Sequence, residues 1–374
     1  MLYLDHAATT PVRPAVAEAM APFLGDRFGN SSGSHEVSRR AKNALEEARE
    51  RAAFLIGARP QEIVFTGGGT ESDNLALKGA ALSGGTRGGV VTAATEHEAV
   101  LETVDFLSRF GCPTRIVGVD RHGLVDSDAL AAAVTNETAL VSVMAANNET
   151  GTVQPLGPLV AAVKAANPHT HFHTDAVQAF AALDIDVDDW GVDLLSLSAH
   201  KFGGPQGVGV LYVRSGVLLE PVLHGGGQEL GRRSGTHNVA GAVGMGTAME
   251  LAVADRVRFR RDTAEARRRF EAKLSDRAER TVPEELTLPQ HSHLRFGQIN
   301  NETLLVLLDR VGVAASAGSA CASGAATVSH VLEAMGLTPD EARRSLRFSF
   351  GWTSSIEDSE QAAELVLEAL KGHT

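Results

Sequence analysis

The stretch Leu194-Leu-Ser-Leu-Ser-Ala-His200-Lys201 is a short apolar run that ends in a lysine and runs on into Gly203 and Gly204. Such a run is typical of a buried β-strand, which would deliver the lysine amine to its C-terminal edge. A lysine there is a poor choice for stability, because burial disfavours the charged ammonium. The neutral amine is nucleophilic and suited to Schiff-base formation. The pattern therefore predicts that Lys201 is a catalytic residue.

Apolar runs of this kind alternate with helical patterns from about residue 35 onward. The other predicted strands are Glu62–Thr66, Val90–Ala93, Arg115–Val119, Ala139–Ala145, His171–Thr174 and Val208–Val213. The predicted helices between them are His35–Ile56, Glu71–Leu82, Ala99–Arg109, Ser127–Val134 and Leu156–Ala166. Continuous apolar strands alternating with amphipathic helices indicate an α/β fold with a mostly parallel, seven-stranded sheet covered on both faces.

The pattern changes after the last of these strands. Residues from about Asn238 to Arg280 read as one long, increasingly charged helix that bridges two domains. A smaller α+β pattern follows, with strands at Leu294–Ile299 and Leu346–Phe350, a helix at Glu302–Arg310 and a final helix from Ile356. We therefore expect a large domain at 14–255 and a small domain formed by 1–13 and 256–374.

Composition limits the class of protein. The chain has 374 residues, of which 43% are hydrophobic and 21% charged, as in ordinary globular proteins. Its net charge of −12 argues against direct nucleic-acid binding. Two cysteines cannot build a disulfide framework, and the first residues lack the features of a signal peptide. No apolar run approaches membrane-spanning length. We expect a cytoplasmic protein with no membrane partner.

An acid and an amide follow another predicted strand, in His173-Thr-Asp175-Ala-Val-Gln178. A carboxylate that keeps a pyridine nitrogen protonated is what pyridoxal phosphate chemistry requires. Open α/β sheets bind ligands at the carboxyl ends of their strands, where Asp175 and Lys201 would meet. The alternative is that Asp175 merely caps a loop.

Three glycines precede a predicted helix in Gly67-Gly-Gly-Thr70. Free N–H groups and the helix dipole make such a junction a phosphate site, and glycines permit a close approach. The alternative is a tight strand-to-helix turn. The spacing fits neither a P-loop nor a dinucleotide fingerprint.

Other polar residues follow the strands at the same edge. His97 follows the strand Val90–Ala93 and would stack on a ring or shuttle a proton, unless it is an exposed histidine at a helix start. Asn147 and Asn148 are similarly placed. His169, His171 and His173 share a strand face, but no Cys, Asp or Glu completes a metal-ligand set, so no metal site is predicted.

Cys321 lies in a segment of very small residues, Ser316-Ala-Gly-Ser-Ala-Cys321-Ala-Ser-Gly324. Such a segment can carry a thiol into and out of a pocket, whereas structural cysteines, as Cys112 would be, sit inert in apolar cores. Arg347, on the predicted strand Leu346–Phe350, would pair bidentately with a carboxylate. Its alternative role is a surface ion pair. Lysine, aspartate and cysteine together suggest an enzyme that moves sulfur.

With these motifs the sequence resembles the NifS/IscS-type cysteine desulfurases, which belong to the fold-type I, class V family of pyridoxal phosphate enzymes. The shared motifs include Tyr3-Leu-Asp-His-Ala-Ala-Thr-Thr-Pro11, Val64-Phe-Thr-Gly-Gly-Gly-Thr-Glu-Ser-Asp-Asn74, Thr95-Glu-His97, Asn147-Asn-Glu-Thr-Gly151, Asp175-Ala-Val-Gln178, Ser198-Ala-His-Lys201, Arg233-Ser-Gly-Thr236, Gly318-Ser-Ala-Cys321 and Arg347-Phe-Ser349. The resemblance covers almost the whole chain.

The resemblance implies a role for each matching residue. Lys201 would carry pyridoxal 5′-phosphate as a Schiff base and serve as acid and base. Asp175 would hold the pyridine N–H, Gln178 the ring hydroxyl, and His97 would stack on the ring. The phosphate would be bound by Gly69, Thr70, Ser198 and His200, with Thr236 reaching in from the partner subunit of a homodimer. Asn148 and Arg347 would bind the substrate carboxylate, and Cys321 would attack the sulfur.

The resemblance further implies that L-cysteine becomes L-alanine and that Cys321 hands a persulfide sulfur to an acceptor protein, either an iron–sulfur scaffold or a tRNA thiolation enzyme. Two alternatives remain. One is a selenocysteine lyase or another class V lyase, for which Cys321 would be dispensable. The other is a non-catalytic sulfur-relay adaptor that keeps the fold and binds no cofactor.

Overall fold

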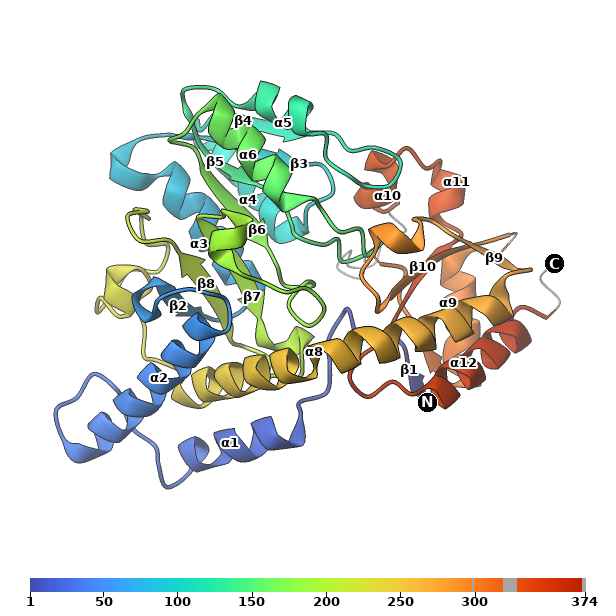
Figure 1. Cartoon of the computed structure of the whole chain (residues 1–374), viewed down its shortest axis with the longest axis horizontal. Helices are drawn as coiled ribbons and strands as arrows, with labels where there is room; N and C mark the ends of the chain where they lie inside the picture. The colour runs from blue at the N-terminus through green and yellow to red at the C-terminus, as the bar shows by residue number, and fades with distance from the viewer. Residues whose placement is uncertain (298, 319–327, 372–374) are drawn as a thin grey trace.

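The computed structural model describes residues 1–297, 299–318 and 328–371. Its centre is a seven-stranded sheet with the order β2-β8-β7-β6-β5-β3-β4 (Figure 1). The strands are β2 (Ile63–Thr66), β3 (Gly89–Ala93), β4 (Thr114–Val117), β5 (Thr138–Ser142), β6 (His171–Asp175), β7 (Leu194–Ser198) and β8 (Gly209–Val213). All neighbours are parallel except that β8 runs antiparallel to β2 and β7. The predicted mostly parallel seven-stranded sheet is confirmed.

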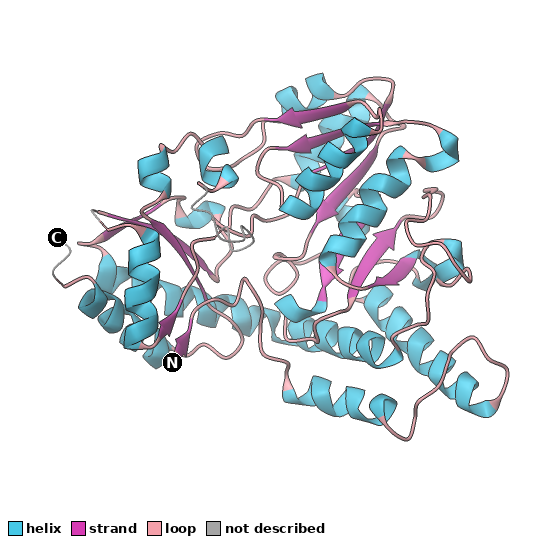
Figure 2. Ribbon diagram, turned by 180° about the vertical axis from the view of Figure 1, so that it is seen from behind, coloured by secondary structure: helices cyan, strands magenta, loops and turns pink. Residues whose placement is uncertain are grey.

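Helices cover both faces of this sheet, as Figure 2 shows. One face carries α3 (Gly69–Ala81) and α4 (Glu98–Arg109), which share a buried cluster with alternate strand residues such as Leu140 and Leu194. The intervening residues, such as Val141 and Leu195, face a second core with the remaining helices of this lobe. Those helices include α2 (Glu36–Phe54), α5 (Ser127–Ala133), α6 (Leu156–Ala166), α7 (Val187–Trp190) and the first half of α8 (Val239–Leu274). Burial on both faces explains why these strands read as continuous apolar runs.

A second lobe is built on the other half of α8 (Figure 1). Its three-stranded antiparallel sheet has the order β12-β10-β9, and its core packs Phe270 of α8 against Phe348. The elements are β9 (Ala278–Arg280), β10 (His291–Phe296), α9 (Asn301–Val311), α10 (His330–Ala334), α11 (Pro339–Ala342), β12 (Ser345–Ser349) and α12 (Ile356–Ala369). The chain's first strand, β1 (Leu2–Tyr3), pairs with β11 (Val313–Ala314) of this lobe.

Several elements differ from the sequence prediction. The helix predicted from Asn238 to Arg280 ends at Leu274, and the short elements β1, β9, β11, α7, α10 and α11 were not predicted. The helix α1 (Pro14–Leu24) was not predicted, and it contacts α8 despite Pro22 within it. The strand predicted at Leu294–Ile299 begins three residues earlier, at His291. The shift has a tertiary cause, because the polar start of β10 is buried by pairing with β12.

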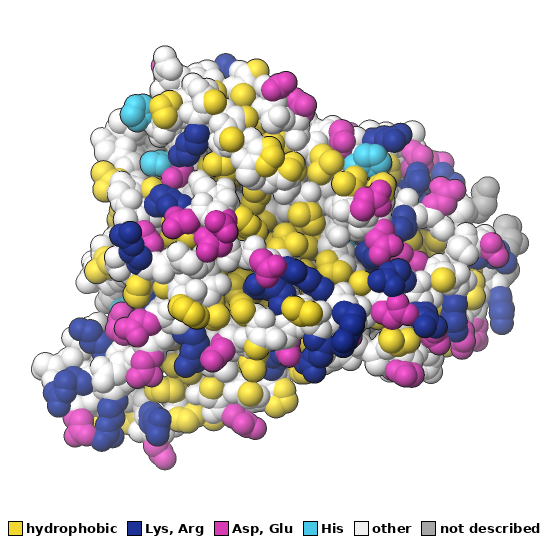
Figure 3. All heavy atoms as spheres, in the orientation of Figure 1, with side chains coloured by type: hydrophobic (Ala, Val, Ile, Leu, Met, Phe, Trp, Pro, Cys, Tyr) yellow, Lys and Arg dark blue, Asp and Glu magenta, His cyan; other side chains and the backbone are white. Residues whose placement is uncertain are grey.

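Charged side chains of both signs lie interspersed over α8 and its surroundings on the face drawn in Figure 3. Several are paired, as in the contacts of Arg256 and Arg260 with Asp184 and of Lys273 with Glu364. Among the described residues, no helix combines the length and the apolar character that a membrane crossing needs.

The buried histidines of β10 predict a specific acid sensitivity. His293 is 2% exposed, and its Nδ1 lies 2.8 Å from Thr281 Oγ1. Burial, aided by the positive charges of Arg347 and Arg295, lowers the pKa of His293 to about 3. As the pH falls from the ordinary histidine pKa toward 3, the unfolded chain takes up a proton that the folded chain does not, so stability is lost over this range.

We expect His293→Gln to lower the slope of unfolding free energy against pH between pH 6 and 4, by up to about 1.4 kcal/mol per pH unit, since one titrating group is removed. Urea unfolding at several pH values measures this slope. His169→Gln, at an exposed position, is the control and should leave the slope as it is. Equal slopes for all three proteins would contradict the prediction.

Candidate active site

A cavity of about 320 Å³ lies at the carboxyl edge of the large sheet. The sequence-predicted residues that line it are Gly69, Thr70, His97, Asn148, Asp175, Gln178, Ser198, His200, Lys201 and Arg347. They come from the start of α3, from the segments that follow β3, β5, β6 and β7, and from β12 of the second lobe. Thr236 is exposed and does not belong to this lining. Cys321 lies outside the described residues.

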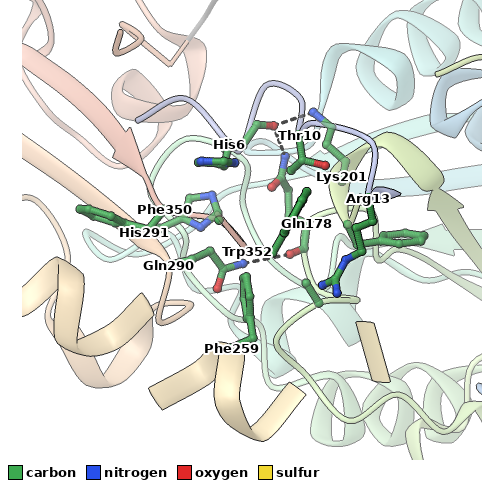
Figure 4. A pocket seen from close by; sticks show the side chains of 14 residues that line it. His6, Thr10, Arg13, Gln178, Lys201, Phe259, Gln290, His291, Phe350 and Trp352 are labelled. Atoms are coloured by element: carbon green, nitrogen blue, oxygen red, sulfur yellow. Dashed lines mark hydrogen bonds between the residues drawn. The ribbon is translucent and has the colours of Figure 1, made fainter. Parts of the chain in front are cut away.

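Lys201 ends a short 3₁₀ turn, Ala199–Lys201, directly after β7. Its Nζ donates to the carbonyl oxygens of Ala7 at 2.6 Å and Ala8 at 2.8 Å. Gln178 Nε2 donates to the Ala7 carbonyl as well, at 2.9 Å. Figure 4 shows Lys201 and Gln178 directed toward this N-terminal segment, beside a second cavity lined by His6, Gln290 and His291. The N-terminal backbone therefore sets the position of the amine.

Asp175 is the last residue of β6 and is 7% exposed. Its Oδ1 accepts a hydrogen bond from the backbone N–H of Val177 at 2.8 Å, which fixes the carboxyl group. Burial raises the pKa of Asp175, whereas the electrostatic effect of His97, the Val177 hydrogen bond and the charge of Lys201 oppose that rise. A buried carboxylate is stabilised when a bound ligand places a positively charged N–H group beside it.

The start of α3 presents glycines and hydroxyls to the cavity. Gly68 has a φ of +149°, and a Cβ added to Gly69 would lie 3.0 Å from Val177 Cγ2. The hydroxyls of Thr70 and Ser198 line the same cavity. Backbone N–H groups at a helix start and nearby hydroxyls are the donors that bind phosphate.

Two details of this cradle go beyond the sequence prediction. The N–H of Gly67 donates to Glu71 Oε2 at 2.7 Å, so the first of the three glycines does not offer its N–H to a ligand. Burial and the charge of Lys201 lower the pKa of His200 to about 4, so its imidazole is neutral near pH 7. His200 Nδ1 lies 3.0 Å from Thr9 Oγ1, a second tie between the site and the N-terminal segment.

His97 is the N-cap residue of α4, and its Nδ1 accepts the N–H of Ala99 at 3.0 Å. This hydrogen bond fixes the imidazole at the cavity wall. Asn147 instead has a structural role, because its side chain accepts the N–H groups of Glu149 and Thr150. Of the two asparagines, Asn148 lines the cavity.

Arg347 is 3% exposed, so the surface ion-pair interpretation is wrong. Its Nη1 donates to the Asn148 carbonyl and its Nη2 to Asp5 Oδ1, both at 2.7 Å. Within the described part of the chain, Arg347 Nε and Asn148 Oδ1 are buried and have no hydrogen-bond partner. Arg347 thus keeps N–H donors for a carboxylate at the cavity wall.

His169, His171 and His173 do not form a ligand set in this structure. His173 is fully buried between the hydroxyls of Ser142 and Ser196. In the described ranges, no group of three or more His, Cys, Asp or Glu side chains is arranged to hold a metal ion.

Sequence reasoning missed two parts of the site. The carbonyls of Ala7 and Ala8 contact Lys201, and backbone acceptors leave no side-chain signal. Asp73 also lines the cavity, and here a signal existed. It occupies the buried stripe of α3 together with Ala76 and Leu77, where an acid is out of place.

These residues fit pyridoxal phosphate. A buried acid is available for the ring nitrogen, a glycine cradle and hydroxyls for the phosphate, and a lysine amine for the aldehyde. The cavity volume is in the range of sites for small cofactors.

Comparison with known proteins agrees with this fit. The sequence pattern of the aminotransferase class-V family matches residues 2–361. The chain is 45% identical to the cysteine desulfurase IscS of Dictyoglomus turgidum, over 96% of this chain and 91% of that protein. It is 42% identical to cysteine desulfurase IscS of Clostridium botulinum, over 99% and 94% of the two chains. A solved structure of a NifS-like protein superimposes with a TM-score of 0.93 at 38% identity and covers 99% of both chains.

Both the match to the family pattern and the identity to these relatives extend over nearly the whole chain. The chain therefore belongs to the class-V aminotransferase family, among its pyridoxal phosphate-dependent cysteine desulfurases.

Proposed function

We propose that the chain converts L-cysteine to L-alanine and takes the sulfur onto Cys321 as a persulfide. The observation that carries the proposal is the convergence of Lys201, Asp175 and Arg347 on one cavity from three separate elements. The lysine amine can form a Schiff base. The buried carboxylate can pair with a charged ring nitrogen, and the guanidinium can bind the carboxylate of an amino acid.

The cofactor would be held by groups on both sides of the cavity. Lys201 would hold the cofactor aldehyde as a Schiff base, and Asp175 would pair with the ring N–H. Gln178 has one amide N–H on the Ala7 carbonyl, which leaves the second for the ring hydroxyl. The imidazole of His97 would stack on the ring, and Gly69, Thr70, Ser198 and His200 would bind the phosphate. Bound pyridoxal phosphate supplies the electron sink that makes the substrate Cα–H acidic.

Arg347 and Asn148 orient the substrate through its carboxylate. The guanidinium is fixed by its hydrogen bonds to Asp5 and to the Asn148 backbone, so it presents its remaining N–H groups in one direction. A preorganised donor loses less entropy on binding than a mobile one. The substrate Cα–H is thereby held toward Lys201.

Lys201 removes the α-proton and returns protons to the substrate carbon skeleton. The carbonyls of Ala7 and Ala8 accept the N–H groups of its ammonium form, which keeps the protonated amine at the cavity edge. The Cys321 thiolate attacks the substrate sulfur as the Cβ–Sγ bond breaks. The bonding pair stays on Cβ, which takes a proton to give alanine, and Cys321 keeps the sulfur as a persulfide.

The proposal includes a homodimer in which Thr236 acts on the partner subunit's site. Its support is that Thr236 is exposed and does not line the cavity of its own chain. We also propose that the domain boundary falls within α8, with a large domain at 14–255 and a small domain made of 1–13 and 256–374. Two separate apolar cores on the two halves of α8 support that division.

The persulfide sulfur would pass to an acceptor protein in the cytoplasm, an iron–sulfur scaffold or a tRNA thiolation enzyme. Assays of sulfur transfer from the loaded enzyme to each acceptor distinguish them.

Lys201→Ala should abolish the visible absorbance of the Schiff base and all turnover of cysteine, because no second amine lines the described cavity. Absorption spectroscopy and alanine release measure the two effects. Lys42→Ala, at an exposed position of α2, is the control and should remain coloured and active. Residual desulfuration by purified Lys201→Ala would argue against Schiff-base chemistry.

Cys321→Ser should bind cofactor and cysteine yet release little alanine, since a hydroxyl does not accept sulfur to form a persulfide. Mass spectrometry after brief exposure to cysteine should show one added sulfur on the Cys321 peptide of the unaltered chain. Cys112→Ser is the matched control, because Cys112 is buried and burial raises the pKa of its thiol. Full desulfuration by Cys321→Ser would instead favour a lyase without a thiol acceptor.

Mixed dimers test the action of Thr236 across subunits. Thr236→Val should weaken cofactor binding, since a phosphate hydrogen bond is lost. The test uses a dimer of one Lys201→Ala chain and one Thr236→Val chain. If Thr236 acts on the partner's site, the site with the unaltered Lys201 receives the unaltered Thr236 and is intact. The other site then carries both substitutions. Cofactor titration should then find half of the sites with unaltered affinity. Two weakened sites would show that Thr236 acts within its own chain.

A further inference from the structure

Glu149 is a buried acid that the proposed reaction does not use. It follows Asn148 in the segment after β5 and is 2% exposed. Its backbone N–H donates to Asn147 Oδ1 at 2.9 Å, and Asn147 Nδ2 donates to the Thr95 carbonyl at 2.9 Å. The backbone at Glu149 is therefore fixed to the segment that follows β3, independently of what its side chain contacts. A carboxyl group buried on such a turn requires hydrogen-bond partners.

The side chain of Glu149 contacts Ser329, the residue that begins α10 in the second lobe. Ser329 Oγ donates to Glu149 Oε2 at 2.6 Å and, as the N-cap, accepts the Leu332 N–H at 3.2 Å. Ser329 is 6% exposed, so little water competes for this hydrogen bond. The contact ties the start of α10 to the segment after β5.

The same carboxyl oxygen of Glu149 lies against Gly318. A Cβ added to Gly318 would lie 2.9 Å from Glu149 Oε2, and the φ of Gly318 is +92°. Glycine is the residue that permits both this close approach and this backbone conformation. Two backbone hydrogen bonds join Ser316, two residues earlier, to Arg347. Gly318 and Arg347 both line the active-site cavity, so Glu149 holds Gly318 at the cavity wall.

Gly318 and Ser329 lie on either side of the stretch that carries Cys321, most of which is outside the described residues. Cys321 follows Gly318 by three residues and precedes Ser329 by eight. Three residues of fully extended chain span at most about 11 Å, so the position of Gly318 limits where the Cys321 thiol can act. Holding both ends of a stretch of chain also reduces the number of conformations open to the residues between them.

We propose that Glu149 is a positioning residue for sulfur transfer, because its carboxyl group holds both ends of the stretch that carries Cys321. This inference rests on the proposed transfer of sulfur to Cys321. The Asn148 carbonyl, one residue before Glu149, accepts from Arg347 Nη1 at 2.7 Å. One turn of chain thus fixes the guanidinium proposed to bind the substrate carboxylate and both ends of the thiol-bearing stretch. Such a common support favours a constant approach of the thiol to the substrate sulfur.

Glu149→Ala separates substrate binding from sulfur transfer. The Arg347 guanidinium is held by the backbone carbonyl of Asn148, which the substitution leaves in place. The spectral change of the holoenzyme on addition of cysteine should therefore occur at an unaltered cysteine concentration. The arrival of sulfur on Cys321 in a single turnover, followed by mass spectrometry, should slow by about tenfold to a hundredfold, since misplacing a reacting group by about 1 Å has an effect of that size. An unaltered rate of arrival would overturn the proposal.

Ser329→Ala removes the other side of the hydrogen bond and tests the same contact if Glu149→Ala does not fold. It should slow the arrival of sulfur on Cys321 without changing cysteine binding, whereas Ser329→Thr keeps the hydroxyl and should restore the rate. Sulfur arrival at the unaltered rate in Ser329→Ala would also overturn the proposal.

The double variant shows whether the two residues act together. Ser329→Ala should slow sulfur arrival by a smaller factor in the Glu149→Ala chain than in the unaltered chain, because the shared hydrogen bond is already lost there. Equal factors in the two chains would overturn the proposal. Glu98→Ala is the control for a loss of negative charge, since the charge of Glu98 also acts on Glu149, and it should leave sulfur arrival unaltered.

A failure of this inference is distinguishable from a failure of the proposed function. If the unaltered chain gains no sulfur on Cys321 after exposure to cysteine, both are wrong. If the unaltered chain gains that sulfur and Glu149→Ala gains it equally fast, only the role of Glu149 is wrong.

Discussion

The hydrogen bonds from Lys201 Nζ to the carbonyls of Ala7 and Ala8 are the contact on which the rest of the site depends. The same segment of chain reaches both lobes, because the Ala7 N–H donates to Ser349 Oγ on β12 while Thr10 Oγ1 donates to the His200 carbonyl. Asp5, two residues before Ala7, accepts from Arg347. One N-terminal segment thus fixes the amine and the guanidinium relative to each other, although Lys201 follows a strand of the large sheet and Arg347 lies in the small sheet.

Burying a charged side chain at the carboxyl edge of the large sheet costs free energy. Burial shifts the pKa of several titratable groups there toward their neutral forms. Burial lowers the pKa of His173 and of His291 to about 3, so both imidazoles are neutral near pH 7. Burial raises the pKa of Asp73 and of Glu96. Lys201, Asp175 and Arg347, which have roles in the proposed reaction, lie among these groups. Selective neutralisation of this kind gives chemically similar side chains different roles.

The sequence predicted the large sheet well because most of its strands are buried on both faces, so that they contain apolar runs followed by polar residues. Lys201 and Asp175 were found by that rule. It failed for β10, where His291 and His293 are polar but buried by the neighbouring strand. The sequence also did not predict the contacts of Lys201 with the Ala7 and Ala8 carbonyls. Every residue has a backbone carbonyl, so a contact between distant parts of the chain through such a group leaves no pattern in the sequence.

Asp73 is a residue whose surroundings are not predicted by the sequence and are shown only by the fold. An acid on the apolar stripe of α3 violates the helix pattern, and such violations mark functional or strained positions. The violation alone does not say whether the acid is charged. The fold buries this acid and brings Asp175 and Glu96, distant in sequence, near it, and burial, then the charge of Asp175, raise its pKa. Function at this site is thus a property of the group of carboxyls, and each one's charge depends on the others.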